Sequence, residues 1–229
     1  MKDGAATQPA RTVKPFEGIE VHLEPNPRSS FIEIKAWTCL DEGWLEQIAC
    51  GPDSREHESL VVIKAKPSQI HASLLMAGFN SGAPGKWTYE DNKLGTVEPT
   101  GDKIDVFVRY PDPAAEGNGK IVEQPIRNWI RDGSMRTDES KRETFPHLPW
   151  VFGGSAIAPN PKAMGPGEHY VADYSGSIIG LVTFGDEVLG FSKVLADEES
   201  VQAPEWEINP KTIPPVGTEV TVILRRFEQ

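Results

Sequence analysis

The sequence predicts a single β-dominated α+β domain with antiparallel or mixed sheets, sandwich-like or barrel-like, and one main helix packed on a sheet. Three observations support this fold class. Short segments in which apolar and polar residues alternate recur along the chain. The 21 glycines and 20 prolines are scattered without a repeat, which is typical of many turns between short strands. Only one segment has helical spacing, with strands before and after it, and this disfavours a doubly wound sheet.

The chain is long enough for one large domain, which we place at residues 16–229, after a flexible N-terminal arm at 1–15. Residues 1–11 resemble the small-residue, proline-containing tether that follows a removed export signal. We therefore expect an extracytoplasmic protein, periplasmic or associated with the envelope through an N-terminal signal that is absent from this sequence. No run of 18 apolar residues occurs, so we expect no transmembrane segment.

The first half of the domain is predicted to contain four strands. Ile19, Val21 and Leu23 alternate with polar residues, which is typical of a half-buried strand. A second strand at 31–37 follows a proline-rich turn, so the two are expected to form a hairpin. Further strands are expected at 44–50 and 57–64, and the apolar run at 60–63 indicates that the last one is covered on both faces.

The main helix is predicted to begin around Pro67 and to end at Gly78. Proline favours the first turn of a helix, and Ser68 is the candidate cap. Ile70 and Leu74 share one face at helical spacing, and glycine readily takes the left-handed conformation that ends a helix.

The second half of the chain is predicted to consist mainly of strands and loops. Strands are expected at 86–89, 104–110, 150–152, 170–172, 177–184 and 218–226. Residues 121–129 fit either a strand or a short helix. Loops are expected at 111–119, 131–142, 159–167 and 197–207, with 131–142 as a mobile, solvated excursion.

Glu46, His57, Glu58 and His71 are the side chains most suited to chemistry. If the helix packs back onto the preceding strand, His71 lies near His57, and two imidazoles with a carboxylate would make a zinc-type site with an open position. The candidate metal ligands are then His57, His71 and Glu58, and Glu46 or Glu58 is the candidate catalytic base. The spacing is not a His-Glu-x-x-His motif, because position 61 is Val. The alternative is a buried His71 that bonds to a backbone carbonyl.

Other chemical classes have weaker support. Ser59 and His57 lie two residues apart on the expected strand, about 6.6 Å, which is too far for a serine nucleophile and its base. Cys39 and Cys50 form either a disulfide, if the protein is exported, or two free buried thiols. Two cysteines cannot hold an iron–sulfur cluster, and no nucleotide-binding glycine motif occurs. The net charge of −11 disfavours binding to nucleic acid or to an anionic membrane.

Several segments resemble the YdjY-like domain of bacterial, and especially planctomycete, proteins. These segments are GWLE at 43–46, EHESL at 56–60, AKPSQIHASLLMAG at 65–78, WVFGGS at 150–155, YVAD at 170–173 and IPPVGT at 213–218. They span nearly the whole chain after the arm. The resemblance implies a domain of that family and stresses Glu46, His57, Glu58 and His71 without giving them a role.

Because no complete catalytic or cofactor motif occurs, we expect a non-catalytic, extracytoplasmic module that binds a small molecule or a protein. The alternative is a metal-dependent enzyme of hydrolase type that uses a divalent metal such as zinc at the histidine and glutamate candidates. A third possibility is a purely structural envelope component.

Overall fold

A computed structural model describes residues 9–112, 120–133, 145–196 and 206–228 of the chain. Eleven strands form its main sheet. They are β1 (Arg11–Phe16), β2 (Ile19–Leu23), β3 (Phe31–Thr38), β4 (Gln47–Cys50), β5 (Ser59–Ile63), β10 (Lys103–Pro111), β11 (Ile121–Pro125), β13 (Trp150–Val151), β16 (Ser177–Gly180), β17 (Gly190–Phe191) and β19 (Glu219–Arg226).

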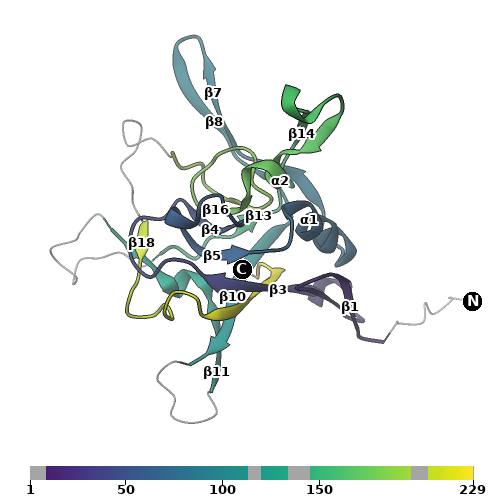
Figure 1. The fold of residues 1–229 in the computed structure, drawn as a ribbon, viewed down its shortest axis with the longest axis vertical. Helices are drawn as coiled ribbons and strands as arrows, with labels where there is room; N and C mark the ends of the chain where they lie inside the picture. Colours follow the sequence, from purple (N-terminus) through teal and green to yellow (C-terminus); the bar gives the residue numbers. More distant parts are fainter. Residues whose placement is uncertain (1–8, 113–119, 134–144, 197–205, 229) are drawn as a thin grey trace, which may run out of the picture.

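The main sheet is mixed and curls into a nearly closed barrel (Figure 1). Its strand order is β16-β4-β5-β3-β19-β10-β13-β17, with β2 beside β3, β1 beside β2, and β11 beside β10. All of these pairs are antiparallel except β4 with β5. Ile179 of β16 also bridges to Leu189, the residue before β17, so the two ends of the strand order meet. The β-dominated α+β fold class predicted from the sequence is confirmed.

Alternation along the long central strands builds the core. On β3, Ile32, Ile34 and Ala36 are completely buried while the residues between them are partly or fully exposed. The antiparallel register places Val106 of β10 opposite Leu224 of β19, and both are completely buried. Each fully buried aliphatic side chain contributes about 2 kcal/mol from removal of apolar surface from water. These two-residue patterns therefore fix which face of each strand points inward.

The main helix, α1 (Pro67–Met76), packs against β2, β3 and the short helix α2 (Val171–Ser175). Ile70 and Leu74 are completely buried, and Gly78 has φ +84°, as the predicted end of the helix requires. The N-terminus of α1 is not capped by Ser68, contrary to the prediction from the sequence. Instead, Asp173 of α2 accepts hydrogen bonds from both the Ser68 backbone N–H (2.7 Å) and its hydroxyl (2.6 Å).

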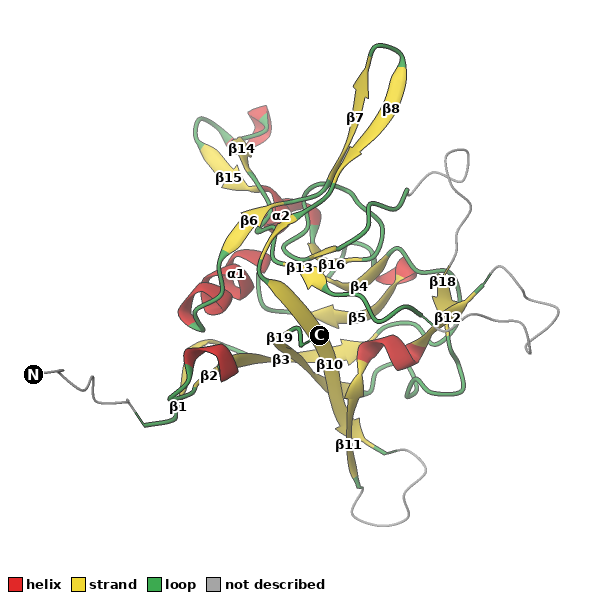
Figure 2. Cartoon of the chain, turned by 180° about the vertical axis from the view of Figure 1, so that it is seen from behind, coloured by secondary structure: helices red, strands yellow, loops and turns green. Residues whose placement is uncertain are grey.

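In the part of the chain that the structure describes, four two-stranded sheets lie around the barrel. They pair β6 (Ser81–Ala83) with β9 (Thr100–Gly101), β7 (Lys86–Glu90) with β8 (Lys93–Val97), β12 (Ile130–Asp132) with β18 (Trp206–Ile208), and β14 (Ile157–Pro159) with β15 (Glu168–Tyr170). The β7–β8 and β14–β15 hairpins both project from the same end of the molecule (Figure 2). Within the described ranges, no helix has the length and apolar composition needed to cross a membrane.

Several local predictions need correction. Strand β1 begins at Arg11, inside the expected arm, because residues 11–16 pair with β2. The strand expected at 57–64 begins only at Ser59, after the 3-10 turn η2 (Glu56–Glu58). The strand expected at 170–172 is the end of β15 followed by α2. Residues 121–129 form both alternatives, β11 and then the 3-10 turn η3 (Ile126–Trp129). Most of the loops expected at 111–119, 131–142 and 197–207 lie outside the described residues.

Candidate functional site

Three of the four predicted site residues gather around one arginine that the sequence did not single out. The Arg55 guanidinium lies 3.0 Å from Glu58 and 3.5 Å from Glu46, and it stacks on the Phe184 ring at 3.7 Å. The His57 ring lies 3.6 Å from the other Glu58 oxygen, with 76% of its side chain exposed. Because both carboxylates already face a fixed positive charge, this cluster is an ion-paired surface arrangement.

The structure does not bring His71 to that cluster. His57 lies in η2, just before β5, whereas α1 starts four residues after the end of β5. Strand β5, from Ser59 to Ile63, is about 13 Å long, so the chain runs that far from η2 before α1 begins. The helix packs onto the sheet as expected, but its main contacts are with β2, β3 and α2, and His71 lies beside Gly154 and Tyr170 rather than beside His57.

The His71 ring lies where α1, α2 and the segment after β13 meet. Its Nδ1 atom is 3.1 Å from the Gly154 carbonyl oxygen and 2.9 Å from the Tyr170 hydroxyl, which itself donates to that carbonyl at 2.9 Å. A carbonyl only accepts, so Nδ1 carries the proton and Nε2 keeps its lone pair. Burial lowers the pKa of His71, although the Gly154 carbonyl opposes this effect. The ring is therefore neutral at pH 7 and held by a backbone carbonyl, as in the alternative interpretation of the sequence.

Sequence reasoning gave no role to the partners of His71. Ser155 has φ +57°, an uncommon conformation for a non-glycine residue, and its hydroxyl accepts the Ala172 N–H at 3.1 Å. Burial raises the pKa of Tyr170 far above its ordinary value. The signal available in the sequence was the set of YdjY-like segments, because three of them, 65–78, 150–155 and 170–173, converge here.

Cys39 and Cys50 are both free thiols. Cys39 follows β3 and Cys50 ends β4, and β5 lies between these two strands. The single S–H of Cys39 has two acceptors within reach, the Ser59 carbonyl at 3.2 Å and the Cys50 sulfur. The bond from Cys39, with help from Ser59 and Ser54, lowers the pKa of Cys50 to about 7 against the effect of burial. The same pairing raises the pKa of Cys39.

Glu187 is a buried carboxylate that no sequence pattern indicated. It is 1% exposed, and its Oε2 atom accepts the N–H groups of Gly185 (2.9 Å) and Asp186 (3.1 Å). Its Oε1 atom is buried without a partner. Burial raises its pKa to about 7, and the nearby Asp186 charge adds to this rise. The carboxyl group closes the loop before β17 and faces the backbone of Gly190.

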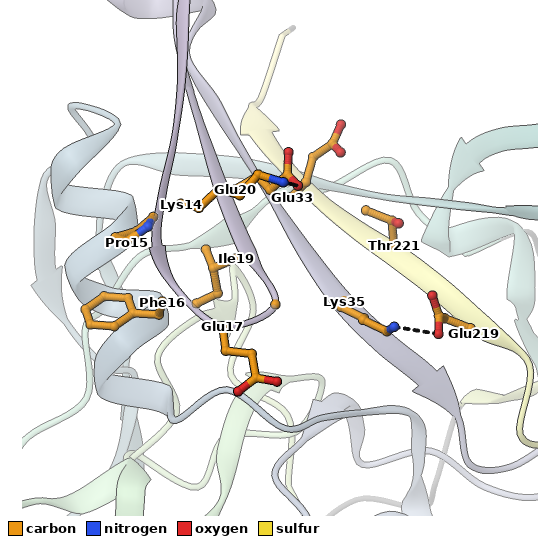
Figure 3. Close-up of a pocket in the computed structure, with 11 residues that line it drawn as sticks. Lys14, Pro15, Phe16, Glu17, Ile19, Glu20, Glu33, Lys35, Glu219 and Thr221 are labelled. Carbon is orange, nitrogen blue, oxygen red and sulfur yellow. Dashed lines mark ion pairs between the residues drawn. The ribbon is translucent and has the colours of Figure 1, made fainter.

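An open groove crosses the outer side of β2, β3 and β19, next to the β1–β2 turn (Figure 3). Its volume is about 510 Å³. Phe16 pairs with Ile19 across the two-residue turn, Gly18 takes φ +74°, and Glu17 lies at the tip. The charged residues that line the groove are Lys14, Glu17, Glu20, Glu33, Lys35 and Glu219.

Two exposed ion pairs lie along this groove. Lys14 meets Glu20 at 2.6 Å, and Lys35 meets Glu219 at 2.7 Å, with the lysine side chains 71% and 46% exposed. Glu17 has no ion pair or hydrogen-bond partner among the described residues. Four carboxylates and two ammonium groups line the groove. Arg109 holds Glu33 through two hydrogen bonds, so Glu17 is the carboxylate in excess, and the two lysine pairs are of the exposed kind that contributes little stability.

Of the candidate metal ligands, His57 and Glu58 lie together, 3.6 Å apart, whereas His71 lies elsewhere, beside Gly154 and Tyr170. Within the part of the chain that the structure describes, no group of three or more His, Cys, Asp or Glu side chains is close enough to hold one metal ion. The predicted metal site and its catalytic carboxylate gain no support from this arrangement, and the roles of Glu46, His57, Glu58 and His71 stay predictions.

The barrel-like sheet, the single main helix and the converging segments define a β-dominated domain of the α+β class. The sequence model of the YdjY domain family matches residues 32–225. The chain therefore belongs to the YdjY domain family, as the sequence resemblance indicated. No curated protein and no solved structure shows a significant match to the chain.

Proposed function

We propose that this chain is a non-catalytic binding module that works outside the cytoplasm and takes an extended, positively charged ligand into the groove beside the β1–β2 turn. The observation that carries the proposal is the carboxylate of Glu17 in that groove, unpaired among the described residues, together with Glu20 and Glu219 whose lysine partners are exposed, over an open volume of about 510 Å³. The net charge of −11 favours the same kind of partner through long-range attraction.

The existing ion pairs leave room for a competing cation. Lys14 and Lys35 are largely exposed, so releasing either ammonium group to water costs about 1 kcal/mol or less. A lysine or arginine side chain of the ligand then takes over Glu20 or Glu219, and Glu17 supplies a further carboxylate.

The direct test is fluorescence anisotropy with a labelled peptide of six lysines, and a peptide of six glutamates as the control ligand. We expect saturable binding of the lysine peptide that weakens as salt is raised, and no binding of the glutamate peptide. The double variant Glu17→Gln/Glu219→Gln is expected to weaken binding about fivefold or more. Glu98→Gln/Glu168→Gln changes the net charge equally at exposed positions outside the groove and is expected to bind normally.

Equal weakening in both double variants would mean that the peptide follows net charge alone, which contradicts a site in the groove. Absence of saturable binding by the unmodified chain contradicts the proposal outright. The extracytoplasmic part of the proposal comes from the composition of residues 1–11 and is tested separately, by fractionation of cells that express the native gene. Recovery in the cytoplasmic fraction contradicts that part alone.

A further inference from the structure

The β7–β8 hairpin stands apart from the barrel (Figure 2). Five residue pairs join its strands, from Lys86 opposite Val97 to Glu90 opposite Lys93, and neither strand pairs with any other described strand. Asp91 and Asn92 form the connecting turn with φ of 51° and 59°, as a type I′ hairpin requires. An isolated two-stranded hairpin is marginally stable in water, so this one has both edges available for a third strand.

One face of the hairpin is apolar and open to solvent. Residues directly opposite each other share a face, so Trp87 with Thr96 and Tyr89 with Leu94 lie on the same side. Tyr89 is 71% exposed and Leu94 is 53% exposed. Such a face gains from a neighbouring strand that extends it with further aromatic side chains.

The register also determines which backbone groups of β7 are unpaired. In a two-residue hairpin the residues that flank the turn bond to each other, so Glu90, and then every second residue back along β7, bonds to β8. Thr88 and Lys86 therefore point their N–H and C=O groups inward. Trp87 and Tyr89 point their N–H and C=O groups to the open edge of β7, where the backbone of another strand can bond to them.

The side chains of β7 are complementary to those of a second β7 strand that runs antiparallel to it. When two copies of β7 pair antiparallel about Thr88, Lys86 faces Glu90 of the second copy and Trp87 faces its Tyr89, each twice by symmetry. Trp87 and Tyr89 are also the residues with outward backbone groups, so the same alignment forms four interstrand hydrogen bonds. The opposite charges, the aromatic pairs and the outward backbone groups of Trp87 and Tyr89 therefore all favour the same register.

We propose that a second copy of this chain docks on the open edge of β7, so that two hairpins form one four-stranded antiparallel sheet with a two-fold axis at Thr88. The open edge of β8 lacks this match, because antiparallel self-pairing about Gly95 places Lys93 opposite Val97. The interface is isologous, as is usual for two-fold dimers. It leaves the acidic groove of the β1–β2 turn outside the contact, so the dimer is independent of the proposed ligand.

Sedimentation equilibrium over a range of protein concentrations tests the dimer with charge variants. Lys86→Glu and Glu90→Lys each replace two attractive pairs with two repulsive ones, and each is expected to weaken dimerisation about tenfold or more. An equimolar mixture of the two variants restores both attractive pairs, and we expect it to form a heterodimer of at least the original affinity. Because each variant must be folded to do so, this mixture distinguishes a lost interface from a lost fold.

A monomeric unmodified chain at all concentrations, or a dimer that neither variant weakens, overturns the proposal. A mixture that stays monomeric overturns it as well. Cross-linking gives a second readout: Thr88→Cys lies on the two-fold axis in a close, non-hydrogen-bonded pair, so oxidation is expected to link two chains. Thr96→Cys on β8 and the unmodified chain, which contains only Cys39 and Cys50, are expected to stay unlinked. Equal linking of all three contradicts the proposed register.

Discussion

Replacing Glu187 with glutamine is expected to stabilise the protein at neutral and alkaline pH. The side chain is 1% exposed, and its Oε1 atom is buried without a partner. A glutamine carbonyl can still accept the N–H groups of Gly185 and Asp186 that Oε2 accepts now. The substitution therefore keeps the shape and the two hydrogen bonds, and it removes a charge that burial disfavours.

The magnitude and its pH range follow from the raised pKa. An ordinary glutamate pKa near 4.5 and a folded-state pKa of about 7 differ by about 3 kcal/mol of free energy. Below pH 4.5 Glu187 is protonated in both states, so its charge costs nothing. As pH rises from 4.5 to 7 the unfolded chain ionises first, so the folded state loses stability, and above pH 7 the full cost is present.

Urea denaturation followed by tryptophan fluorescence at pH 5, 6, 7 and 8 measures this effect. We expect the free energy of unfolding of Glu187→Gln, relative to that of the unmodified protein, to rise by about 2–3 kcal/mol between pH 5 and pH 8. Glu168→Gln, at an exposed position, is expected to show no such trend. A difference for Glu187→Gln that is independent of pH, or that reverses sign at pH 8, refutes the reasoning.

Three further perturbations test separate parts of the fold. Arg109→Met is expected to lower the free energy of unfolding by about 2–4 kcal/mol in urea denaturation, because it leaves the half-buried Glu33 without its two-pronged partner at 2.7 and 3.1 Å. Gly101→Ala is expected to cost about 3 kcal/mol or more in thermal unfolding, since φ is +133° and a Cβ would lie 2.1 Å from a backbone oxygen. Oxidised glutathione is expected to join Cys39 and Cys50 in one intramolecular disulfide, detected as the loss of two hydrogens in the intact mass.

Each of these has a matched control. Lys14→Met removes an exposed pair and is expected to change stability by less than about 0.5 kcal/mol, so equal effects of it and Arg109→Met contradict the account. Gly78→Ala has φ +84° but open space around its Cβ, and it is expected to cost only about 1 kcal/mol. Cys50→Ser is expected to abolish the intramolecular disulfide, and unchanged free thiols in the oxidised parent contradict the thiol pairing.

The parts of the fold that were predictable are those in which one local pattern decides the structure. The alternation at 104–110 predicted β10, and the spacing of Ile70 and Leu74 followed by Gly78 predicted α1. These patterns succeed because burial on one face fixes both the period and the orientation. The β8 strand was missed, because Leu94 and Val97 are separated by Gly95 and Thr96 and are exposed, so no buried face shapes their pattern.

The candidate site was harder to predict because it depends on distant parts of the chain. Arg55 lies in a polar turn with no periodic signal, yet it determines the surroundings of Glu46 and Glu58. The direction of α1 after β5 is set by tertiary packing against β2 and β3, and the sequence around residues 64–66 does not encode it. The position of His71 beside Tyr170 therefore required the structure, although its partial burial did not.

The central claim, that the groove beside the β1–β2 turn is the binding surface, is tested most directly by a backbone-amide NMR titration with the six-lysine peptide. The account predicts saturable shifts that centre on Glu17, Glu20 and Glu219 and that are lost in Glu17→Gln/Glu219→Gln. Shifts that centre on His57 or His71 instead, or no saturable shifts, would contradict it.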